Sequence, residues 1–285
     1  MGADYRIDLA ALRASIDADR AAGRRPFCVV GTAGTVNTGA TDDLVGLREV
    51  CDAEGLWLHV DGAFGALAAL SPAHRDLVAG VDRADSLAFD LHKWMYLPFE
   101  AGCILVRDAA AQRAAFTLRP SYLQPVGRGP AARPMEFADI GIDLSRGFRA
   151  LKVWMSLRHH GSDMFGRLIG QNIEQAHHLA DLIGSEPELE LLAPVAMNVV
   201  CFRYVPPDSR VVGGDLDALN TEVLLRLQES GVAVPSSTLL QGRFAIRVAI
   251  TNHRSRRGDF DLLVSEVLAH GRAVAVQLVP ASGQA

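Results

Sequence analysis

The sequence predicts an α/β protein in which a sheet flanked by helices is followed by a smaller α+β domain. Two observations favour this class. Between residues 27 and 106, apolar runs of strand length alternate with helical patterns, and the runs lack the polar alternation of half-exposed strands. A stretch without periodicity at 117–143 then separates this part from the remainder. We therefore expect one domain over residues 1–143 and a second over 144–285.

The elements of the first domain follow from spacing and capping signals. Leu9, Leu12 and Ile16 recur at helical spacing, and Gly23 follows as a stop. Asp42 is expected to cap a second helix. Strands are expected at 27–31, 57–61, 86–89 and 103–106, and they are so apolar that neither face of the sheet should meet water.

The 117–143 stretch contains four prolines and three glycines, so we expect a mobile functional loop or a domain connection. Ser145 should open a helix that ends at Gly161, and an apolar stripe predicts another helix over 165–183. The remaining expected elements are strands at 199–204, 232–234 and 244–250, with helices at 215–230 and 259–270.

Composition limits the class of ligand. The chain has 285 residues, is 49% hydrophobic and carries a formal net charge of −5, so it has no basic field for nucleic acid. No apolar run approaches the roughly 18 residues that a membrane span needs, and no signal-peptide core is present, which favours a cytoplasmic protein without membrane contact. The cysteines form no CxxC pair and the histidine pairs lack helical partners, so we expect no metal.

Polar residues gather where the predicted strands end, which is where open α/β sheets bind ligands. Lys93 lies between apolar neighbours, and burial there would favour a neutral, nucleophilic amine. A structural cap or ion pair is the alternative interpretation for each acid, and a hydrogen-bonded core histidine is the alternative for His92. The candidate residues are Thr35, Asp61, Asp90, His92 and Lys93.

These segments together resemble the pyridoxal-phosphate-dependent amino-acid decarboxylases, the group of aromatic-amino-acid, tyrosine, histidine and glutamate decarboxylases. The matching segments are TAGT at 32–35, NTGATD at 37–42, HVDGAF at 59–64 and FDLHKW at 89–94. The resemblance implies part of a fold-type-I large domain, with a mixed, mostly parallel sheet, followed by the small domain. It also implies pyridoxal 5'-phosphate as cofactor and decarboxylation of an L-amino acid to the amine and carbon dioxide.

The resemblance assigns roles around the cofactor ring. Lys93 would form the Schiff base with the cofactor, and Asp61 would hold the proton on the ring nitrogen. Ala63 would pack on one ring face. Asp90 and His92 would stand near the phosphate and the reacting carbon.

Three further candidates lie after Lys93. In this family a loop tyrosine returns a proton after carbon dioxide leaves, and Tyr122 in the 117–143 stretch matches it, a surface-packed tyrosine being the alternative. Arg146 or Arg149 could pair with a substrate carboxylate, or both could belong to a solvated helix face.

The sequence departs from the family upstream of Lys93. Family members are much longer at the N-terminus, where they carry a phosphate-binding loop and a ring-stacking histidine, and only Thr35 and its neighbours remain here as phosphate candidates. We expect a fragment of a longer decarboxylase, a chain complemented by a separate N-terminal half, or a non-catalytic interaction subunit. A homodimer is expected for an active form. The alternative activity is an aldehyde-forming or other lyase reaction on the same cofactor.

Overall fold

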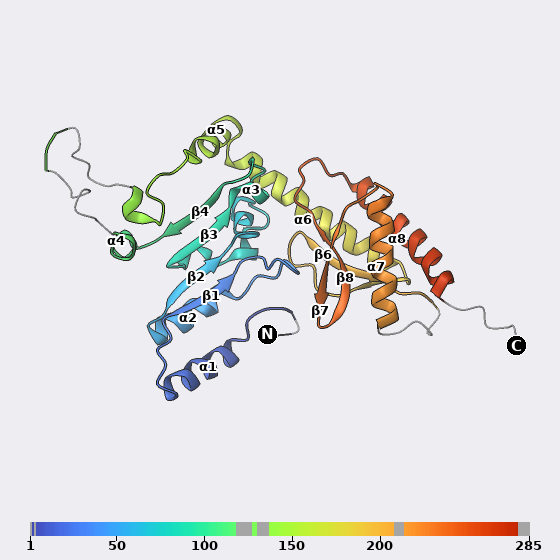
Figure 1. Ribbon diagram of the computed structural model, residues 1–285, viewed down its shortest axis with the longest axis horizontal. Helices are drawn as coiled ribbons and strands as arrows, with labels where there is room; N and C mark the ends of the chain where they lie inside the picture. Colours follow the sequence, from blue (N-terminus) through green and yellow to red (C-terminus); the bar gives the residue numbers. More distant parts are fainter. Residues whose placement is uncertain (1, 3, 118–126, 130–136, 208–213, 279–285) are drawn as a thin grey trace, which may run out of the picture.

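The computed structural model describes residues 2, 4–117, 127–129, 137–207 and 214–278. Figure 1 shows two lobes, each built on its own sheet, with the long helix α6 (Ser162–Ser185) running from one to the other. Across the described residues, none of the helices combines the length and the hydropathy that a membrane span requires.

The first sheet has four strands in the order β1-β2-β3-β4. The first three are parallel and β4 is antiparallel to β3, which confirms a mixed, mostly parallel sheet. All four strands coincide with the predicted runs to within one residue. They are β1 (Cys28–Thr32), β2 (Trp57–Asp61), β3 (Ser86–Asp90) and β4 (Gly102–Val106).

Helices connect these strands. The side chain of Asp8 caps α1, and Gly55 ends α2 at a φ of 64°, a conformation that glycine adopts without strain. The α-helices are α1 (Leu9–Ala21), α2 (Leu44–Glu54), α3 (Leu91–Trp94) and α4 (Ala109–Phe116); short 3₁₀ helices are η1 (Ala66–Leu70), η2 (Arg75–Val78), η3 (Val81–Arg83) and η5 (Phe137–Ile140).

Two expectations about this half were wrong. The cap of α2 is Asp43, not Asp42, because Asp43 accepts a hydrogen bond from the Gly46 N–H. The sheet is also not enclosed on both faces by the described residues. Leu58 is fully buried, whereas the side chain of Ile104 points to the opposite face and is 56% exposed.

The second sheet is antiparallel, with the order β5-β6-β8-β7, and α7 and α8 pack on each other beside it (Figure 1). This confirms the prediction that a smaller α+β part follows the first sheet. Its elements are α5 (Ala150–His160), β5 (Leu189–Leu191), β6 (Val199–Tyr204), α7 (Gly214–Glu229), β7 (Ser236–Leu240), β8 (Arg243–Ala249) and α8 (Arg257–Leu278).

Several boundaries here differ from the predictions. The strand expected at 232–234 is absent, and β7 begins after Pro235, because proline has no N–H for a strand ladder. The helix expected from Ser145 begins at Ala150, since Gly147 disfavours a helical start. The last helix is longer than expected, and the short β5 was not predicted.

Two of the hydrophobic cores among the described residues share α6. Phe165, Ile169 and Ile173 pack in the core of the first sheet, whereas Leu179 and Ile183, further along the helix, pack in the core of the second. The helix therefore ties the two lobes together. The domain boundary after residue 143 stays a prediction.

Candidate active site

Lys93 lies on α3, a single turn directly after β3. Leu91 and Trp94, three positions apart, are buried in the first core. Their burial turns His92 and Lys93 toward the surface at the carboxyl end of the strand. A buried apolar pair thus fixes where the amine points.

The amine of Lys93 is ion-paired. Its Nζ lies 2.8 Å from Oδ2 of Asp90, the last residue of β3. The Lys93 side chain keeps 35% of its surface exposed, so the apolar enclosure expected for it is incomplete in the described residues. Asp90 is a direct partner of Lys93.

His92 is fixed in one neutral tautomer by its hydrogen bond. Its Nδ1 accepts from the N–H of Ala101 at 3.1 Å, which assigns the ring proton to Nε2. That Nε2 faces Oδ2 of Asp90 at 3.8 Å, and the ring packs edge-on against Phe99. The structure therefore brings His92, Lys93 and Asp90 together at the end of β3.

A cavity of about 630 Å³ opens beside Lys93 and lies between the two lobes. Phe64 and Tyr96 line it from the first lobe, and Arg247 and Thr251 line it from β8 and the segment after it. The Nε of Arg247 donates to the carbonyl of Val36 at 2.7 Å, and burial lowers the pKa of its guanidinium. The cavity thus holds an amine, an imidazole and a guanidinium.

Arg247 is not among the candidate residues that the sequence predicts. The signal was a single charged residue within the apolar run FAIRVAI at 244–250. A charge in a strand that is otherwise apolar costs free energy unless it is paired or functional. The hydrogen bond from Arg247 to the Val36 carbonyl of the first lobe offsets part of this cost.

Asp61 ends β2, the strand next to β3. Its Oδ1 accepts from the Ala63 N–H at 3.0 Å, and its backbone pairs with Thr32 on one side and Ala88 on the other. The carboxylate is exposed at the same edge of the sheet as Asp90. Neither Asp61 nor Ala63 lines the cavity beside Lys93.

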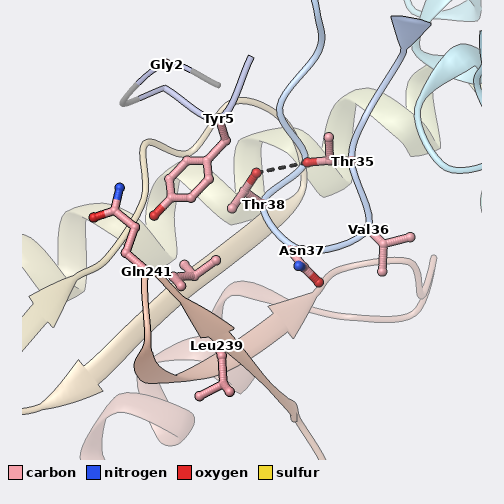
Figure 2. Close-up of a pocket in the computed structure, with 9 residues that line it drawn as sticks. Gly2, Tyr5, Thr35, Val36, Asn37, Thr38, Leu239 and Gln241 are labelled. Carbon is pink, nitrogen blue, oxygen red and sulfur yellow. Dashed lines mark hydrogen bonds between the residues drawn. The ribbon is translucent and has the colours of Figure 1, made fainter. Parts of the chain in front are cut away.

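Thr35 lies in a different pocket, of about 490 Å³, which Figure 2 shows between the 35–38 turn, Tyr5 and the hairpin residue Gln241. Its hydroxyl lies 2.9 Å from the hydroxyl of Thr38 (Figure 2) and also accepts from the Ala40 N–H. Thr35 is thus placed apart from Lys93, and its role toward a phosphate stays a prediction.

The candidates for the substrate carboxylate and the proton donor are also apart from the cavity or undescribed. Arg149 pairs with Glu100, and Arg146 donates to the carbonyl of Phe137 at 3.3 Å. Neither arginine lines the cavity beside Lys93. Tyr122 lies outside the described residues.

The fold and the site together define a class of protein. In this class, the strand ends of a mostly parallel sheet present an acid and a lysine toward a small antiparallel domain. Residues 1–205 match the model of the pyridoxal-dependent decarboxylase conserved domain, and the chain belongs to that family. The family match confirms the cofactor that the sequence predicts.

Known relatives agree with this assignment. The chain is 34% identical to the aromatic-L-amino-acid decarboxylase of Bacillus atrophaeus over 95% of its length and 56% of that protein. It is 31% identical to tryptophan decarboxylase 2 of Oryza sativa, covering 87% of this chain and 49% of that one. The solved structure of Oryza sativa TDC with PLP and tryptamine superposes with a TM-score of 0.86 at 27% identity, covering 95% of this chain and 56% of that chain. The chain spans about half the length of the curated relatives it matches.

The residues present fit the reactive part of pyridoxal phosphate. Lys93 offers the primary amine that an aldehyde needs, and Asp61 offers a carboxylate at the neighbouring strand end for a ring N–H. His92 offers an N–H donor beside Lys93.

Proposed function

We propose that this protein acts in the pyridoxal-phosphate-dependent decarboxylation of an L-amino acid, which yields the amine and carbon dioxide. One observation carries the proposal: Lys93 follows a parallel strand, is paired with Asp90 and opens onto a cavity that a cation from the second lobe also lines. The names of the relatives, among them aromatic-amino-acid, tryptophan and tyrosine decarboxylases, support an aromatic substrate.

The side chains divide the chemistry between them. When bound, pyridoxal phosphate supplies an electron sink for the electrons that carbon dioxide leaves behind. Lys93 would hold the cofactor through its amine, and Asp90 would pair with that amine when it is free. Asp61 would keep a proton on the ring nitrogen. His92 would offer its Nε2–H beside Lys93.

Arg247 is the residue that we assign to the substrate carboxylate. It combines a permanent positive charge with a place on the cavity wall opposite the lysine turn. Arg149, predicted for this role, is engaged by Glu100. Decarboxylation breaks the bond between the α-carbon and the carboxylate of the substrate. An arginine bound to that carboxylate would hold the leaving group in a fixed orientation.

Tyr122 is proposed as the acid that protonates the carbon after decarboxylation. The second candidate function, aldehyde formation, is favoured by relatives named phenylacetaldehyde synthase from Arabidopsis thaliana and 3,4-dihydroxyphenylacetaldehyde synthase from Drosophila melanogaster, at 31% and 34% identity. Replacing Tyr122 with Phe should lower the yield of amine relative to aldehyde. An unchanged ratio would remove Tyr122 from the mechanism.

We further propose that activity needs a partner, either a second copy of the chain or the half of the relatives' length that this chain does not span. The exposed apolar face of the first sheet, which includes Ile104, supports this. Without such a partner the chain would be a non-catalytic interaction subunit. The cytoplasmic location also remains a prediction.

Reductive trapping tests the cofactor site directly. The chain contains only two lysines, Lys93 and Lys152, so identification of the modified peptide assigns an adduct to one of them or to the α-amino group. Incubation with pyridoxal phosphate followed by borohydride should attach the cofactor to the Lys93 peptide. The adduct should vanish in Lys93→Ala and persist in Lys152→Arg. Trapping that is absent, or that is equal on both lysines, would contradict a built site.

A further inference from the structure

A buried amide lies directly behind the turn that carries Lys93. Asn172, on α6, is fully buried, and its Oδ1 accepts hydrogen bonds from Trp94 Nε1 at 3.1 Å and from the Tyr96 hydroxyl at 2.8 Å. These two aromatic residues follow Lys93 closely in the chain. The indole N–H can only donate, so the amide oxygen must face it and the amide orientation is fixed.

The other end of the amide contacts the second lobe. Asn172 Nδ2 donates to Gln175 Oε1 at 3.1 Å and to the carbonyl of Asn252 at 3.2 Å. Asn252 follows Thr251, which lines the cavity opposite Lys93. All four hydrogen-bonding positions of the amide are therefore used: two by aromatic residues next to Lys93, one by Gln175 on the same helix and one by Asn252.

The turn needs such an anchor. The helix α3 has four residues, too few for a helix to be stable by itself, and no side chain caps its start. Tyr96 just after it has a φ of 56°, a left-handed conformation that tyrosine rarely adopts. Its ring also packs against His253 at 5.2 Å. Contacts from outside the turn must hold this backbone.

We propose that Asn172 is a positioning residue, whose amide holds the Lys93 turn and the Thr251 segment at a fixed separation across the cavity. The functional purpose of this positioning by Asn172 rests on the proposed function. Its physical content, a Lys93 amine held in place by Asn172, is independent of any cofactor.

Competitive acetylation measures how firmly the Lys93 amine is held, through the rate at which that amine reacts. The full chain, without cofactor, is treated with a trace of acetic anhydride beside free N-α-acetyl-lysine as reference, and the Lys93 peptide is quantified by mass spectrometry. In the native chain Lys93 should react slowly, because it is half-buried and paired with Asp90. Asn172→Ala removes all four of these hydrogen bonds, and the relative rate should rise at least on the order of fivefold, the equilibrium equivalent of losing one of them.

Asn220 provides the matched control. It is equally buried, and its amide bonds to the backbone of Tyr204 and Leu216 in the second core. Asn220→Ala should lower the thermal midpoint yet leave the Lys93 rate unchanged. An equal rise in both variants would overturn the proposal, because Asn172 would then act only through stability.

Tyr96→Phe serves where Asn172→Ala does not fold. It removes only the hydroxyl that donates to Asn172 and keeps the ring. A smaller rise in the Lys93 rate is expected, and an unchanged rate would overturn the proposal. Failure of cofactor trapping in the native chain would count against the proposed function alone, since acetylation needs no cofactor.

Discussion

At the scale of single residues, two adjacent carboxylates have different tasks. Asp43 caps α2 through one hydrogen bond from the Gly46 N–H. Asp42 is buried, and its two oxygens accept from the N–H groups of Ile7 at 2.7 Å and Thr32 at 2.8 Å. Asp42 thus joins the segment before α1 to Thr32, the last residue of β1.

Replacement of each acid should separate these tasks. Asp43→Ala should lower the free energy of unfolding by about 1 kcal/mol, the usual cost of a lost helix cap. Asp42→Ala should cost about 3 kcal/mol, because it leaves two backbone donors without their charged acceptor. Denaturant unfolding of both variants measures the difference. Equal losses would show that the bonds of Asp42 contribute no more than a cap.

Residues joined by local sequence were predictable, and those joined by tertiary contacts were not. Lys93, His92 and Asp90 lie within one strand end and one helical turn, so strand and helix periodicity place them together. Arg247 reaches the same cavity only because β8 of the second lobe packs against the 35–38 turn of the first. No periodicity within either segment encodes that meeting.

At the scale of elements, α8 is fastened to the second sheet by an ion pair beside β5. Glu188 accepts a bidentate pair of hydrogen bonds from Arg272 of α8 and one from the Tyr204 hydroxyl. Gly271 lets α8 approach, since a Cβ there would lie 2.5 Å from the Tyr204 ring. The helix itself was predicted from the sequence, but this ion pair depends on residues distant in sequence.

This ion pair should make stability depend on pH. The hydrogen bonds from Arg272 lower the pKa of Glu188 below its usual 4.5, although desolvation opposes them. A lowered folded-state pKa contributes stability above the unfolded value and loses it as the pH falls through the folded one. At pH 7 the native chain should therefore have a higher thermal midpoint than Glu188→Gln. This difference in thermal midpoint should close below about pH 4.5.

Thermal melts between pH 7 and pH 3.5 measure this gap. Arg272→Gln removes the same pair from the other side and should show the same narrowing. A gap that stays constant over this range would contradict the assignment of the pH dependence to Glu188.

At the scale of the whole molecule, the described residues leave one face of the first sheet open. Phe27, Ile104 and Phe116 line a hollow of about 520 Å³ there, and Phe27 is 82% exposed. The pattern of the strands predicted burial on both faces, and the relatives are about twice as long as this chain. The strands thus have the composition of a sheet covered on both sides, while the described residues cover one side.

An apolar face of this kind should drive association of the isolated chain. We expect light scattering on a size-exclusion column to give a mass above the monomer that increases with concentration. The double variant Phe27→Glu, Ile104→Glu should shift the mass toward the monomer without lowering the thermal midpoint, because both side chains are already largely exposed. Val276→Glu is the matched control, since Val276 is 78% exposed on α8, away from this face, and should change nothing. A native chain that stays monomeric at every concentration, or a double variant that keeps the native assembly, would show that this face does not carry the contact.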